Sequence, residues 1–189
     1  MKLVLEYIQT ELRKAATRPF VIAIDGNCGS GKTTLAAYLS GELNASVFHM
    51  DDFFLQPHQR TEVRLTEPGG NVDYERFKSE ILNHITDANG ITFQPFSCSE
   101  WKLGNAVTIP YNDIVIVEGS YSHHPYFENA YNVKIFLEIS PEEQRKRILT
   151  RDGKSIWPMF QEKWIPMENR YFTTFQIKEN SSFCCCLSK

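Results

Sequence analysis

The stretch GNCGSGKTTL, residues 26–35, decides the fold, because it satisfies the pattern G-x-x-x-x-G-K-[ST]. The apolar run FVIAID comes directly before it and is typical of a buried parallel strand. Residues 31–41 after it are typical of a helix. Glycines at this junction let backbone N–H groups curl around an anion at the N-terminus of the helix. Strand, loop and helix together predict a phosphate-binding P-loop.

The P-loop predicts a bound nucleotide and a magnesium ion. Lys32 is expected to reach the β- and γ-phosphates, and the Thr33 hydroxyl to ligate Mg²⁺. No His/Cys grouping has zinc spacing, so the expected metal is the Mg²⁺ that accompanies the nucleotide. The predicted cofactors are ATP and Mg²⁺. We interpret Cys28 as a small tolerated residue without a role of its own. The predicted nucleotide-binding residues are Gly26, Asn27, Cys28, Gly29, Ser30, Gly31, Lys32, Thr33 and Thr34.

Strand and helix patterns alternate along the rest of the chain. The runs ASVFHMDDFF, ITFQPF, DIVIVEG and NVKIFLEIS are read as further strands. The segment DYERFKSEILNHI carries its apolar residues on one helical face, and Ser140, Pro141 and Glu143 form a capping box that starts another helix. The predicted fold class is α/β, a doubly wound parallel sheet of the P-loop NTP hydrolase type found in nucleoside and nucleotide kinases.

Length and composition limit the partners. The 189 residues suit a single domain, residues 1–189, and the Pro/Gly-rich stretch 56–71 is read as a long functional loop. A net charge of −3 offers no basic surface to nucleic acid. The N-terminal segment is amphipathic, neither a signal peptide nor a membrane span, and five irregularly spaced cysteines form no disulfide framework. We therefore expect a cytoplasmic protein with a small-molecule partner and no membrane partner; a homo-oligomer is compatible with the sequence.

Acidic residues follow two of the predicted strands at the edge where the P-loop lies. Asp51 can accept the proton of an acceptor hydroxyl, help hold the metal or cap a turn. Asp52 is weighed equally between metal binding and a turn cap. Glu118 closes an apolar run, where an acidic residue would orient Mg²⁺ or its water, although an acidic strand end in a loop is also possible. The predicted metal ligands are Thr33, Glu118 and Asp52.

Hydrolytic switch GTPases share the P-loop but need two further motifs. The sequence DANG, residues 87–90, matches D-x-x-G only formally, because it lies between a predicted helix and a predicted strand. No N/T-K-x-D motif for guanine is present. The sequence therefore favours a kinase over a switch.

Five segments together resemble the uridine kinase-like branch of P-loop kinases, which also takes in nicotinamide riboside kinases and phosphoribulokinase relatives. They are GNCGSGKTT, DDFF, EPGGNVDYERF, IVIVEGSYS and EEQRKRILTRD, and the resemblance spans about residues 19–175. The P-loop alone is shared by many families, whereas its combination with DDFF and VEG at these intervals is much more specific.

The resemblance implies roles for further residues. Asp51 would act as base, an insert over residues 56–72 would bind the acceptor, and a lid over residues 141–170 would close over the transferring phosphate. Capping of a helix is at least as good an interpretation of Asp73. Arg147 and Arg151 lie on one helix face and suit a phosphate clamp, whereas the ordinary i,i+4 pairs Glu142–Lys146 and Glu143–Arg147 are typical of a solvated face. The implied acceptor residues are Asp51, Arg64, Asp73, Tyr74 and Phe96, and the implied catalytic residues are Asp51, Lys32, Arg147 and Arg151.

The sequence leaves the acceptor open. Uridine kinases usually carry an aromatic residue and a histidine after the third strand, whereas PFSCSEWKLG offers Phe96 and Trp101 without a histidine. His123 and His124 could meet the acceptor, but we interpret them as surface residues of a loop before Pro125. The predicted function is an ATP-dependent kinase that phosphorylates a hydroxyl of a small molecule such as a nucleoside. The alternative is a nucleotide-binding regulator or ATPase without an acceptor.

Overall fold

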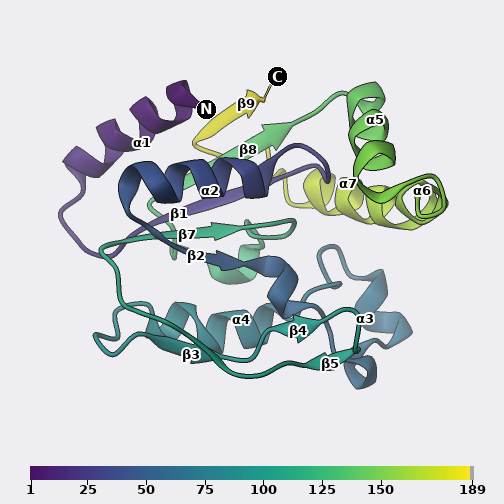
Figure 1. Ribbon diagram of the computed structural model, residues 1–189, viewed down its shortest axis with the longest axis horizontal. Helices are drawn as coiled ribbons and strands as arrows, with labels where there is room; N and C mark the ends of the chain where they lie inside the picture. Colours follow the sequence, from purple (N-terminus) through teal and green to yellow (C-terminus); the bar gives the residue numbers. More distant parts are fainter. Residues whose placement is uncertain (188–189) are drawn as a thin grey trace.

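A computed structural model describes residues 1–187, and a five-stranded parallel sheet forms its centre (Figure 1). The strand order is β2-β7-β1-β8-β9, so consecutive neighbours in the sheet are joined by crossovers. This order confirms the predicted doubly wound sheet. The bounds are β1 (Phe20–Gly26), β2 (Ser46–His49), β7 (Ile114–Glu118), β8 (Val133–Glu138) and β9 (Phe183–Cys186).

Helices cover both faces of the sheet. Buried side chains of α1 (Lys2–Lys14) and α2 (Lys32–Leu43) pack on one face, and those of α4 (Tyr74–Glu80) and α7 (Ile165–Thr174) on the other. The remaining helical segments are α3 (Glu62–Thr66), α5 (Pro141–Asp152), α6 (Trp157–Met159), the π-helix η5 (Phe160–Trp164) and the 3-10 turns η1 (Met50–Phe53), η2 (Pro57–Gln59), η3 (Leu82–His84) and η4 (Pro125–Phe127).

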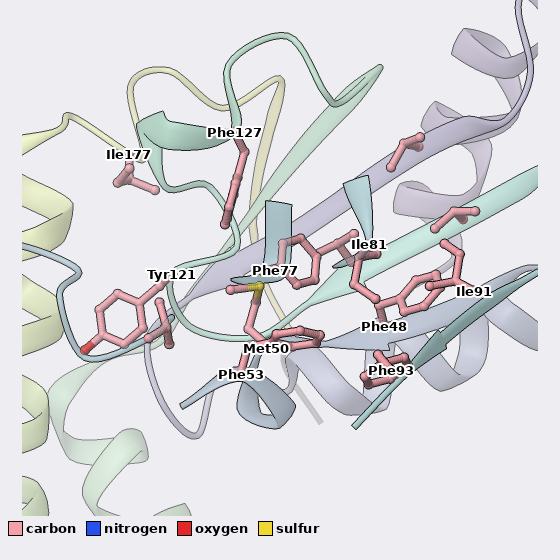
Figure 2. Packing of buried hydrophobic residues seen from close by; sticks show 14 of the residues in the cluster. Phe48, Met50, Phe53, Phe77, Ile81, Ile91, Phe93, Tyr121, Phe127 and Ile177 are labelled. Carbon is pink, nitrogen blue, oxygen red and sulfur yellow. The ribbon is translucent and has the colours of Figure 1, made fainter. Parts of the chain in front are cut away.

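Successive residues of the central strands enter opposite cores, as expected for parallel strands that are covered on both faces. In β1, Val21 joins the cluster on the α4 side, and Ile22 joins the cluster under α1 and α2. The first cluster is rich in aromatic rings, and Figure 2 shows side chains of β2, η1 and α4 meeting there. Phe53 contacts Phe77 edge-on at 5.0 Å between ring centroids and stacks on Phe93 at 5.4 Å.

The predicted strand ITFQPF does not join the central sheet. Its first half forms β3 (Ile91–Phe93), which pairs antiparallel with β6 (Val107–Ile109), and its end begins a second small hairpin of β4 (Phe96–Ser97) and β5 (Lys102–Leu103). The middle residue of β3 is exposed between two buried ones. That alternation suits an antiparallel ribbon with one face in solvent, whereas a central parallel strand is buried on both faces.

All central strands run in the same direction, so their carboxyl ends meet at one edge. In Figure 1 the arrows point to the right, where α5, α6 and α7 gather. The cysteine-rich segment near the C-terminus forms β9, parallel to β8. Ser188 and Lys189 lie outside the described residues. All five cysteines are free, and no helix over residues 1–187 is both long and apolar enough to cross a membrane.

The interpretation of two histidines as surface residues is wrong. His123 is 3% exposed and His124 is 8% exposed. The His123 ring lies within hydrogen-bonding distance of the Ala23 carbonyl and the Ser181 hydroxyl, both at 3.3 Å. Burial lowers the pKa of His123 to about 3 and that of His124 to about 4. Both rings are therefore neutral at neutral pH.

These buried histidines predict acid sensitivity. Because the folded-state pKa of His123 lies below the unfolded value, the unfolded chain binds the additional proton, and stability falls as pH drops below about 6.5. We expect His123→Gln to reduce the loss of unfolding free energy between pH 6.5 and 5 by about 2 kcal/mol. Urea unfolding at several pH values measures this difference. The same change at exposed His84 serves as the control, and an unchanged pH dependence in His123→Gln would contradict the argument.

Candidate active site

A cleft of about 1210 Å³ opens at the carboxyl ends of β1, β2 and β7. The P-loop lines it from Cys28 to Thr34, and Glu118 and Asp51 enter it from the ends of neighbouring strands. Side chains from the β4–β5 hairpin and from α5, η5 and α7 form the remaining walls. Proteins of the α/β class bind their ligands at the carboxyl edge of the parallel sheet, which is where this cleft lies.

The P-loop is curled as an anion site requires. Gly26 has φ +137°, and a Cβ there would lie 2.1 Å from the Leu137 carbonyl oxygen, so close packing against β8 admits only glycine. The Lys32 ammonium donates to the carbonyls of Gly26 at 2.7 Å and Asn27 at 3.1 Å. Gly26 and Asn27 thus hold the lysine, while residues 28–34 face the cleft.

Three side chains meet beside the P-loop and form the candidate metal position. The Thr33 hydroxyl donates to Glu118 Oε1 at 3.1 Å, and His49 Nδ1 lies 2.5 Å from the same oxygen. The hydrogen bond with Glu118 raises the pKa of His49. Glu118 Oε2 is buried and has no partner among the described residues. A hydroxyl and an unsatisfied carboxylate oxygen are ligands that fit Mg²⁺.

Asp51 lies in the cleft between the P-loop and the hairpin. Its carboxylate is exposed to the cleft but has protein atoms on most sides, and this desolvation raises its pKa. The nearby Lys32 ammonium acts in the opposite direction. A carboxylate that is accessible yet partly desolvated is a better proton acceptor than one in open water. The predicted position of Asp51 beside the phosphate loop is therefore the position that the structure shows.

The two predicted clamp arginines line the cleft from α5. Arg147 donates to the carbonyls of Gly29 and Ser30, both at 3.3 Å, and pairs with Glu143 at 3.0 Å. Arg151 pairs with Asp152 at 2.8 Å and is 60% exposed in its side chain. Both arginines thus line the cleft, and the Glu143–Arg147 pair expected from the sequence is also present.

The structure does not bring four predicted site residues to the cleft. The Arg64 guanidinium pairs with Glu75 at 2.6 Å and lies 3.9 Å over the Tyr74 ring. Asp73 caps α4 through the Arg76 amide and accepts from Gln59, so its carboxylate is already satisfied. Asp52 does not line the cleft, although it lies near His49 and Glu118. We therefore leave Arg64, Asp73, Tyr74 and Asp52 out of the proposed site, since internal contacts or their position turn them away from it.

Other residues occupy the acceptor side. Phe96 lines the cleft as expected, and Phe54, Asn71 and Trp101 line it as well. Arg60 lies over the Trp101 indole at 5.3 Å. Their gathering depends on the hairpin folding back over the insert, a long-range contact for which the sequence pattern carries no signal.

Glu168 of α7 is a site residue that sequence reasoning missed. One carboxylate oxygen accepts the Cys28 amide of the P-loop at 2.9 Å, and the other accepts the Ser120 hydroxyl at 2.6 Å. Glu168 is 4% exposed and lies at the wall of the cleft. Burial and the Glu168 carboxylate raise the pKa of the neighbouring Cys28 thiol, which stays protonated and unreactive. No local motif marks Glu168, because its partners lie 140 and 48 residues away in the chain.

Comparison with known sequences identifies relatives over most of the chain. A family model described as an AAA domain matches residues 22–165. Human nicotinamide riboside kinase 1 is 31% identical over 159 residues, which are 76% of this chain and 75% of that protein. Uridine kinase-like protein 3 of Arabidopsis thaliana is 28% identical over 149 residues, covering 71% of this chain and 31% of the relative.

Solved structures share the fold. A possible uridine kinase from Bacillus stearothermophilus aligns with a TM-score of 0.72 at 20% identity, covering 97% of this chain and 99% of that one. A putative fructose transport system kinase from Silicibacter aligns with a TM-score of 0.67 at 18% identity, covering 97% of each chain. The chain therefore belongs to this AAA-domain family and, within it, to the P-loop kinases related to nicotinamide riboside kinase and uridine kinase, as its motifs predicted.

Proposed function

We propose that this protein is an ATP-dependent kinase that transfers the γ-phosphoryl group to a hydroxyl of a small molecule, a nucleoside or a related metabolite. The observation that carries the proposal is the position of Asp51, an accessible carboxylate in the same cleft as the P-loop. A nucleotide-binding regulator would need the P-loop but would have no use for a base beside it.

In the proposed reaction, residues 28–34 and Lys32 bind the phosphates of ATP. The oxygen of the acceptor hydroxyl attacks the γ-phosphorus, and Asp51 accepts the proton of that hydroxyl. The new bond joins that oxygen to phosphorus, and the bond to the bridging oxygen breaks, so that its electron pair leaves with ADP. Arg147 and Arg151, which line the cleft from α5, would offset the charge of the transferring group.

The metal in this proposal is Mg²⁺, which when bound would offset the negative charge of the nucleotide phosphates. Thr33 and Glu118 are the residues that would hold it, since a hydroxyl and an unsatisfied buried carboxylate oxygen lie together there. His49 shares Glu118 with Thr33 and orients the carboxylate.

The aromatic acceptor side supports a nucleoside-like acceptor. Phe54, Phe96 and Trp101 offer flat apolar surfaces to a ring, and Asp51 lines the same cleft, where it would meet a sugar hydroxyl of such an acceptor. Relatives are named for nicotinamide riboside and uridine, two ribosides that differ in the attached ring.

A screen for acceptor-dependent ADP release tests the proposal. Purified protein, Mg·ATP and a panel of nucleosides, nicotinamide riboside, pantothenate and sugar phosphates are combined in a coupled assay. We expect one class of riboside to raise turnover well above background. A slow rate of ADP release that no compound in the panel increases would instead support the regulator or ATPase alternative.

Replacing the P-loop lysine should remove nucleotide-dependent activity. Lys32→Ala deletes the ammonium that the proposal assigns to the β- and γ-phosphates, a charge-assisted interaction, so we expect a loss of ATP affinity or turnover of about 100-fold or more. Calorimetric titration with Mg·ATP and the coupled assay measure the two effects. Lys146→Ala, at a side chain that is 75% exposed, is the matched control. Unchanged affinity together with an unchanged rate would refute the P-loop assignment.

Replacing the proposed base should separate catalysis from binding. Asp51→Asn keeps the size of the side chain but cannot accept a proton at neutral pH, so we expect turnover to fall by about 100-fold or more. Mg·ATP affinity should change little, because Lys32 and the loop amides carry most of that contact. The neighbouring change Asp52→Asn, outside the cleft, is the control and should retain most activity.

Two other outcomes would reassign Asp51. A joint loss of rate and Mg·ATP affinity that added Mg²⁺ partly restores would make it chiefly a metal ligand. Transfer at the wild-type rate would exclude Asp51 as the base.

A further inference from the structure

The helix α7 contacts the P-loop at two levels. Near its start, Glu168 accepts the Cys28 amide at the cleft side of the loop, at 2.9 Å. One turn later, the Tyr171 hydroxyl donates to Asp25 Oδ2 at 2.9 Å, beneath the loop. Asp25 is fully buried, and its other oxygen accepts the amide of Gly26, the first residue of the P-loop, at 2.7 Å. The helix therefore touches both sides of the loop that is to hold the nucleotide.

The same helix also contacts the acceptor-side insert, residues 56–72. The guanidinium of Arg170 donates to the Thr66 carbonyl. Gly69 packs so closely against this region that a Cβ there would lie 2.6 Å from the His124 ring and 3.1 Å from the Tyr171 ring. The insert therefore cannot shift toward α7 without moving these rings.

A column of parallel rings joins the insert to Tyr171. The Arg64 guanidinium lies 3.9 Å over the Tyr74 ring, which stacks on His124 at 4.2 Å between centroids. His124 in turn lies parallel to Tyr171, at 6.1 Å and an interplanar angle of 6°. Arg64 also donates to the Gly70 and Val72 carbonyls, so the column begins on the backbone of the insert. None of the four members of the column lines the cleft, namely Arg64, Tyr74, His124 and Tyr171.

We propose that Tyr171 is a positioning residue that couples the acceptor insert to the P-loop, so that nucleotide binding orders the insert before the acceptor arrives. The inference rests on the proposed function, because it assigns the nucleotide to the P-loop and the acceptor to the insert side. Tyr171 touches neither ligand. It acts through Asp25 on one side and through His124 and Gly69 on the other.

The physical reason is that a buried carboxylate tolerates few arrangements. Asp25 accepts from Gly26, His123 and Tyr171, and losing one donor leaves a buried acceptor unsatisfied. A nucleotide that fixes the P-loop backbone therefore favours the arrangement in which Tyr171 is seated. A seated Tyr171 ring in turn fixes the surface on which Gly69 and His124 pack. Coupling of this kind is reciprocal, since each site biases the same packed element.

Hydrogen exchange of the insert, with and without a non-hydrolysable Mg·ATP analogue, tests the proposal without any acceptor. In the wild-type protein we expect the analogue to slow exchange of amides in residues 61–72 by about fivefold or more, the lower end of typical coupling. In Tyr171→Phe, which keeps the ring but deletes the bond to Asp25, we expect most of that nucleotide-dependent protection to be lost.

The matched control is Tyr131→Phe. Its hydroxyl is buried without a partner among the described residues, so its removal deletes no hydrogen bond, and the nucleotide-dependent protection should remain as in the wild type. A merely structural role would speed exchange in Tyr171→Phe equally in both states and leave the protection ratio unchanged, which would overturn the proposal. Wild-type protein that binds the analogue by calorimetry but shows no protection of residues 61–72 would overturn it as well. Absence of calorimetric binding would instead overturn the proposed function, and this inference with it.

Discussion

The pairing of β1 with β7 on one side and β8 on the other is the constraint on which the site depends. In register, Ile24 lies opposite Glu118, and Gly26 lies opposite Leu137. Because the strands are parallel, every chain segment that leaves them emerges at the same edge. This register brings the P-loop and Glu118 together, and the pairing of β2 with β7 adds Asp51 to the same cleft, although the three come from separate parts of the sequence. A slip of one residue would turn Glu118 toward the opposite face.

Electrostatic balance shapes the cleft that this register creates. Asp51, Glu118 and Glu168 place carboxylates around the phosphate loop, where anions would otherwise repel an incoming nucleotide. Each carboxylate has a compensating contact: Lys32 lies near Asp51, Thr33 and His49 bond Glu118, and backbone and hydroxyl donors satisfy Glu168. Of these three carboxylates, that of Glu118 keeps a buried oxygen, Oε2, without a partner among the described residues. The arrangement is suited to a ligand that brings its own cation.

Three residues that the sequence predicted to bind the acceptor pack inside the fold and do not line the cleft. Arg64 and Tyr74 belong to a stack of rings that ends on Tyr171, and Asp73 starts α4. A sequence motif can therefore identify the family correctly even though some of its residues pack inside the fold and do not line the cleft. Arg64, Tyr74 and Asp73 do not line the cleft, and packing inside the fold explains why they occur in the same sequence as the P-loop.

The sequence by itself determined the P-loop, the parallel α/β fold and the edge at which Asp51 and Glu118 emerge. These features follow from local patterns: a glycine-rich junction, apolar runs and residues at strand ends. Tertiary structure decided the rest. It buried His123 and His124, moved ITF from the central sheet into an antiparallel ribbon and brought Glu168 onto the Cys28 amide. It also turned Arg64 and Asp73 away from the cleft. The contact of Glu168 with Cys28 joins residues 140 positions apart, and that of His123 with Ala23 joins residues 100 apart, so neither leaves a local pattern in the chain. The ribbon and the Arg64–Glu75 pair span shorter separations, but they also depend on which segments pack together.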